Sequence, residues 1–171
     1  MVSPYKGSGQ ITREKFMFYE MRTAARLMEE GLSDSDVEER IVEDNLFQYP
    51  TEKSIRQMAK TCIRRLHGLQ DESLIAAVAA MPQDAAKQIC LYAMMKQYRL
   101  VWDFMITVIG EKYRMQNFSF SQMDVNVFFM QLQEQDDYVA GWSESTMKKI
   151  RQILIRVLAE NEYLDDIKAD H

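Results

Sequence analysis

The chain has 171 residues, of which 47% are hydrophobic and 27% are charged, and its formal net charge at pH 7 is -5. This length suits one domain or two small packed lobes, and six Gly and three Pro are too few for a turn-rich β-sandwich. The longest apolar runs, "LIAAVAAM" and "FMITVI", fall far below the ~20 residues of a membrane helix. Residues 1–15 also lack the apolar stretch of a secretion signal. We therefore expect a cytoplasmic protein without a membrane partner.

Apolar residues recur with helical spacing along nearly the whole chain, and no segment has the alternation of a strand. Taken in chain order, the predicted helices cover about 13–30, 34–45, 52–68, 72–81, 84–115, 122–135 and 144–161. The expected N-terminal caps of these helices are Thr12, Ser33, Thr51, Asp71, Asp84, Ser121 or Asp124, and Ser143. The long region 84–115 should bend or break near Tyr98, and residues 134–142 should form a connector with one helical turn.

The predicted fold is all-α, a compact bundle of about seven to nine helices. We expect a flexible N-terminal segment over residues 1–11, and an acidic C-terminal tail over residues 162–171. Residues 12–161 between them should form a single helical domain, with two packed lobes as the alternative arrangement.

Positive charge is concentrated on one side of the predicted helix 52–68, although the chain as a whole is acidic. At about 100° per residue, Lys53, Arg56, Lys60 and Arg64 share a narrow sector opposite the apolar side. Three interpretations stay open: a solvated face neutralised by the acidic helix before it, a surface that binds phosphates, or a docking site for an acidic protein.

The last helix repeats this arrangement. Its apolar side includes Ile150 and Leu154, and the opposite side carries residue types that contact phosphates and base edges. The candidate residues on this helix are Lys148, Lys149, Gln152 and Arg156. Lys15, Arg22 and Arg26 add a basic stripe to the first helix.

Signs of an enzyme are few, and we expect no catalytic residue, metal site or cofactor. The sequence contains no phosphate-binding glycine loop and no HExxH motif. Cys62 and Cys90 lie in apolar stretches, as reduced core cysteines do. The acidic residues Glu134, Asp136 and Asp137 could serve a metal-dependent nuclease, but they are more typical of a connector.

The most specific segments of the sequence are "EGLSD" (Glu30–Asp34), "DNLF" (Asp44–Phe47) and "WSEST" (Trp142–Thr146). Together with the sequence around them, over roughly residues 20–160, they resemble the BrxA family, whose members are small components of bacterial BREX phage-exclusion operons. The resemblance implies a non-enzymatic, cytoplasmic defence protein with a helical fold similar to that of the antitermination factor NusB. It also implies two kinds of partner, DNA bound by its phosphate backbone and other BREX proteins. The alternative is an adaptor that docks other BREX components without contacting DNA.

Overall fold

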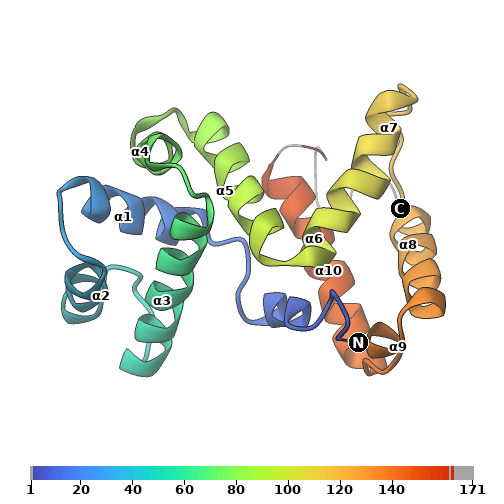
Figure 1. Cartoon of the computed structure of the whole chain (residues 1–171), viewed down its shortest axis with the longest axis horizontal. Helices are drawn as coiled ribbons and strands as arrows, with labels where there is room; N and C mark the ends of the chain where they lie inside the picture. The colour runs from blue at the N-terminus through green and yellow to red at the C-terminus, as the bar shows by residue number, and fades with distance from the viewer. Residues whose placement is uncertain (1, 162, 164–171) are drawn as a thin grey trace. The chain divides into compact units, whose positions relative to one another are not determined.

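The computed structural model describes residues 2–161 and 163, and within these residues all regular secondary structure is helical (Figure 1). The predicted all-α class is therefore confirmed. The described residues separate into two compact units. We call Phe16–Gln97 the central unit, and we call the residues up to Lys15 together with those from Tyr98 onward the split unit.

The central unit contains five helices, drawn from blue to green in Figure 1. They are α1 (Phe18–Glu29), α2 (Asp34–Glu43), α3 (Glu52–Gly68), α4 (Glu72–Ala80) and α5 (Gln83–Gln97). Helix α1 packs against α3 and α4, α2 packs along α3, and α5 contacts both α3 and α4. The core between them is formed by buried apolar side chains, among them Met21, Ile41, Cys62, Leu66 and Val78.

The split unit begins with a short 3-10 helix, η1 (Ser8–Thr12), and continues after Tyr98. Its other elements are α6 (Arg99–Phe104), the π-helical segment η2 (Met105–Ile109), α7 (Gly110–Arg114), α8 (Gln122–Gln135), α9 (Asp137–Ala140) and α10 (Glu144–Glu160). Helix α10 packs against η1, and η1 also contacts α6. If the uninterrupted run from α6 to α7 is taken as one helix, the described residues form nine helices besides η1, within the predicted range.

Most helix starts follow the predicted capping residues, but Asp84 lies inside α5, which begins one residue earlier at Gln83. Side-chain oxygens of Ser33, Thr51, Asp71 and Ser143 each accept a hydrogen bond from a backbone N–H in the first turn. Ser121 and Asp124 are the alternative predicted starts of one helix, and both take part, since the Ser121 N–H donates a hydrogen bond to the Asp124 carboxylate at 2.8 Å at the start of α8. The break predicted near Tyr98 is also present, because Tyr98 is extended between α5 and α6.

The start of the first helix is different from the prediction. Helix α1 begins at Phe18 rather than near Arg13, and Met17 before it has a left-handed backbone with a φ of 57°. The tertiary contacts of this stretch compete with helix formation, because Glu14 is buried and accepts a hydrogen bond from the Tyr98 hydroxyl at 2.6 Å. Phe16 is buried as well.

The segment expected to be flexible, residues 1–11, contains most of η1. Ile11 in this segment is fully buried, and the Ser3 hydroxyl donates to the Asp136 carboxylate at 2.7 Å. The predicted acidic tail over residues 162–171 lies outside the described residues, apart from Tyr163. Among the described helices, none has the length and apolar composition that crossing a membrane requires.

Candidate nucleic-acid interface

The first predicted basic face lies on α3 in the central unit. The apolar side predicted for this helix is buried, with Cys62 and Leu66 fully inaccessible. Lys53, Lys60 and Arg64 are exposed on the opposite side and Arg56 is half-buried there, as their spacing predicts. Arg65, a further cation of this helix, is fully buried and donates a hydrogen bond to the Phe16 carbonyl at 3.0 Å. Its charge therefore does not belong to the surface.

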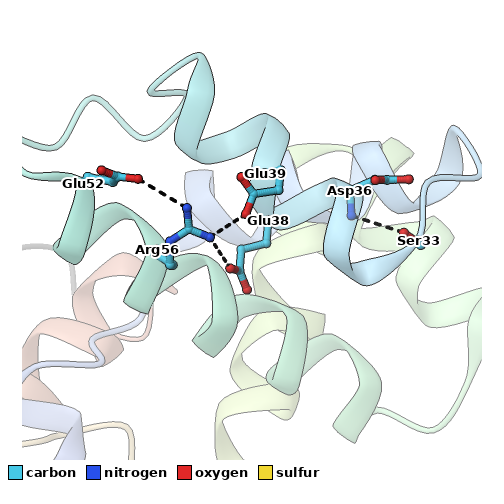
Figure 2. A network of polar contacts seen from close by, with 6 residues as sticks. All are labelled: Ser33, Asp36, Glu38, Glu39, Glu52 and Arg56. Carbon is cyan, nitrogen blue, oxygen red and sulfur yellow. Dashed lines mark hydrogen bonds and ion pairs between the residues drawn. The ribbon is translucent and has the colours of Figure 1, made fainter.

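Arg56 differs from its neighbours on this face because it is surrounded by carboxylates (Figure 2). One terminal nitrogen of Arg56 lies 2.6 Å from Glu38 and 2.6 Å from Glu39, and the other lies 3.4 Å from Glu52. The hydrogen bond and the charge of Arg56 lower the pKa of Glu39, and the carboxylates raise the pKa of Arg56. At Arg56 the structure therefore supports the interpretation of a basic face neutralised by the preceding acidic helix.

Lys53 and Lys60 lie on the same face without such compensation. Within residues 2–161 and 163, neither lysine forms an ion pair. Arg64 donates from Nε to the Gln97 side-chain oxygen at 3.2 Å. The exposed positive charge of α3 is therefore carried mainly by Lys53 and Lys60, with Arg64 held against α5.

The second predicted face lies on α10 in the split unit. Ser143 caps this helix, and Ile150, Leu154 and Leu158 pack its apolar side into the core. All four candidates, Lys148, Lys149, Gln152 and Arg156, are exposed. Lys149, Gln152, Ile153 and Arg156 follow the i, i+3, i+4, i+7 spacing, so they lie along one side of the helix.

This side of α10 borders a cavity of about 630 Å³, which we call the basic cavity. Its lining comes from three segments that are far apart in the sequence: the end of η1 and the residues after it, the first residue of α8, and α10. The lining residues are Thr12, Lys15, Gln122, Lys149, Gln152, Ile153, Ile155 and Arg156. Three cations and no carboxylate line the cavity, so it is suited to an anion.

Three of the residues predicted on α10 are thus brought together, with Lys148 exposed outside the lining. Lys15 and Gln122 complete the cavity, and the sequence did not link them to α10. The proximity of Lys15 to α10 depends on the packing of η1 against α10, which no local spacing reveals.

The basic stripe expected on the first helix is not formed. Lys15 precedes α1 and belongs to the split unit, whereas Arg22 and Arg26 belong to the central unit. Arg22 donates to the carbonyls of Val78 and Met81, and Arg26 donates to that of Ala79 at 3.0 Å. These carbonyls lie at the C-terminal end of α4, so both arginines stabilise a helix end.

Among the side chains whose chemistry is common in catalysis, the two cysteines are buried, and His67 and Asp136 contact neighbouring residues. Burial raises the pKa of the Cys62 thiol to about 12, and that of Cys90 likewise to about 12. His67 contacts the Asp34 carboxylate at 2.8 Å, and Asp136 caps α9 through the Val139 N–H. Within the part of the chain that the structure describes, no three His, Cys, Asp or Glu side chains are grouped as metal ligands would be.

Comparison with known proteins finds a family model and relatives that carry the same family name. The BrxA family model matches residues 4–171. BREX protein BrxA of Bacillus cereus (strain H3081.97) is 32% identical over 170 residues, which is 99% of this chain and 84% of that protein. BREX protein BrxA of Escherichia coli O9:H4 (strain HS) is 25% identical, over 92% of this chain and 73% of that protein.

A solved structure supports the fold. The crystal structure of an uncharacterized protein from Magnetospirillum magneticum has a TM-score of 0.68 and 22% sequence identity, over 90% of this chain and 79% of that one. At this identity the likeness concerns the fold alone, and similarity to NusB stays a prediction. The family match over nearly the whole chain and the relative with 32% identity show that the chain belongs to the BrxA family.

Proposed function

We propose that this protein is a cytoplasmic, non-enzymatic accessory component of a BREX phage-defence system that binds DNA through its phosphates. Membership of the BrxA family supports the role in defence, because the curated relatives are named BREX proteins. The observation that carries DNA binding is the basic cavity of α10, with Lys15, Lys149 and Arg156 in its lining and no carboxylate among them.

The physical basis of binding is the release of counterions from DNA. A cation that neutralises one phosphate frees condensed ions, so each contact steepens the fall of log affinity with log salt concentration by about 0.9. Gln152 and Gln122 can donate to phosphate oxygens beside the cations. Lys53 and Lys60 on α3 add exposed charge. Since the whole chain carries a net charge of -5, we expect its affinity for DNA to be moderate. Since phosphate contacts carry no sequence information, we also expect little sequence preference.

A mobility-shift titration with a fixed duplex at two salt concentrations tests this proposal. The variant with both Lys149→Ala and Arg156→Ala should bind more weakly, and its salt slope should fall by about two units. A matched control, Lys6→Ala with Lys96→Ala, removes the same charge from exposed positions outside the cavity. Equal affinity and slope for the wild type and the folded α10 variant would contradict the proposal.

A role as an adaptor is the second candidate, and an apolar stripe on α8 favours it. Met123, Val127 and Met130 are 66%, 41% and 60% exposed and follow the i, i+4, i+7 spacing of one helix side. Exposed methionines adapt well to a partner helix. If Met123→Glu with Met130→Glu abolishes phage resistance while folding and DNA affinity are unchanged, docking is essential. Resistance at the wild-type level would argue against the adaptor role.

A further inference from the structure

The basic cavity has the size of a small-ligand site rather than that of a flat contact surface. Its volume of about 630 Å³ lies within the range of roughly 300–1,000 Å³ that small-molecule pockets occupy. A DNA duplex presents a convex backbone to a protein, so it does not require a hollow of this volume. The hollow therefore has room for a compact ligand that enters between η1, α8 and α10.

The charge of the cavity restricts this ligand to a polyanion. Lys15, Lys149 and Arg156 line it, and within residues 2–161 and 163 none of the three forms an ion pair. Three like charges around one hollow repel each other, and a ligand with several negative charges relieves this repulsion. A neutral or singly charged ligand would leave most of the repulsion among these cations in place.

The spacing along α10 favours a chain of phosphates. Lys149 and Arg156 are seven residues apart, which places their backbones about 10.5 Å apart along the helix axis. Gln152 lies between them on the same side, and Lys15 approaches from the segment that follows η1. Successive phosphate groups can contact these cations in turn, whereas a single phosphate is too small to reach both ends of the row.

The remaining lining suits a nucleoside. The amides of Gln122 and Gln152 can each donate and accept hydrogen bonds, as pairing with the edge of a base requires. Ile153 and Ile155 provide apolar contact for a sugar or a base face. We propose that the basic cavity binds a nucleoside triphosphate.

The ligand should be bound without being hydrolysed. The lining contains no carboxylate to hold Mg²⁺ beside the phosphates or to orient an attacking water. Because Lys149 and Arg156 are also assigned to DNA phosphates, the nucleotide should compete with DNA, and this consequence alone rests on the proposed function. The cavity would then couple DNA binding to the nucleotide level.

Isothermal titration calorimetry with ATP, GTP, tripolyphosphate and adenosine tests the binding directly. We expect saturable binding of a nucleoside triphosphate, weaker binding of tripolyphosphate and none of adenosine. Lys149→Ala with Arg156→Ala should weaken nucleotide binding at least tenfold, and the control Lys6→Ala with Lys96→Ala should not. Gln152→Ala should weaken the binding of the nucleotide more than that of tripolyphosphate. Circular dichroism confirms that each variant is folded.

The proposal is overturned if neither nucleotide binds saturably, or if the α10 variant binds as tightly as the wild type. Tripolyphosphate binding as tight as that of both nucleotides would overturn the nucleoside part.

Mobility shifts with and without ATP separate this inference from the proposed function. DNA binding that depends on Lys149 and Arg156 without any nucleotide binding would refute the inference and leave the proposed function standing. Nucleotide binding without any DNA binding would refute the proposed function and leave the inference standing.

Discussion

At the scale of residues, similar side chains have different roles according to what surrounds them. Arg56 and Lys60 are four positions apart on one side of α3, yet Arg56 contacts three carboxylates and Lys60 is exposed without an ion pair among the described residues. Arg65, one position after Arg64, is fully buried. The number of cations in a helix therefore overstates the charge that it offers to a ligand.

Leu66 illustrates how burial translates into stability. Its side chain is fully inaccessible, so Leu66→Ala removes buried methyl groups and leaves a cavity in the central unit. We expect a loss of about 2–5 kcal/mol in the free energy of unfolding, measured by urea denaturation. The control Leu46→Ala changes a residue that is 39% exposed and should cost much less. A loss below ~1 kcal/mol for Leu66→Ala would mean that α3 packs through another side.

At the scale of elements, the acidic helix α2 and the basic helix α3 are joined by charge as well as by packing. Val37 and Ile41 bury the apolar side of α2, while Glu38 and Glu39 contact Arg56 from α3. At the other end of the pair, His67 near the end of α3 contacts Asp34 at the start of α2. These contacts orient α2 along α3. The contacts of Arg56 also neutralise positive charge that, judged by residue spacing alone, would be available to a ligand.

The contact between Glu39 and Arg56 predicts a dependence of stability on pH. The pKa of Glu39 is lowered in the folded state, so its ionised form favours folding. This contribution is present at neutral pH and is lost as the pH falls from about 4.3, the usual pKa of Glu, through the lowered folded value. Thermal melts between pH 7 and pH 3 should show that Glu39→Gln loses less stability on acidification than the wild type.

Glu43→Gln is the control for this experiment. Glu43 lies on the same helix and forms no ion pair among the described residues, so its variant should follow the wild-type pH profile. Since Glu39 is exposed, the difference should be small and should shrink with added salt. Identical profiles for wild type and Glu39→Gln at low salt would show that the contact adds nothing to stability.

At the scale of the whole molecule, exposed positive charge is present in both units although the protein is acidic. The central unit presents Lys53 and Lys60, and the split unit presents the basic cavity. Local charge of this kind attracts a polyanion even when the net charge is negative. The two sets of residues can therefore be tested separately and together.

Combined substitutions measure the contribution of each unit to DNA binding. Lys53→Ala with Lys60→Ala should lower the salt slope by about two units, as should Lys149→Ala with Arg156→Ala, and the fourfold variant should lower it by about four. Arg56→Ala should change the slope less than Lys60→Ala does, because carboxylates already neutralise Arg56. If one pair of substitutions leaves the slope unchanged, the unit that carries it does not contact the duplex.

The sequence by itself determined the helical class, most helix boundaries and the sides of α3 and α10 that face solvent. These features depend on local rules: apolar spacing decides which side is buried, and capping residues such as Ser33 and Ser143 satisfy backbone N–H groups within one turn. Only the tertiary structure decided the late start of α1, where the buried contact of Glu14 with Tyr98 competes with helix formation. The tertiary structure also decided which cations are neutralised by carboxylates, and that Lys15 lies beside α10 in the basic cavity. Both outcomes depend on packing between segments that are far apart in the sequence, and the spacing of residues within one helix does not reveal such packing.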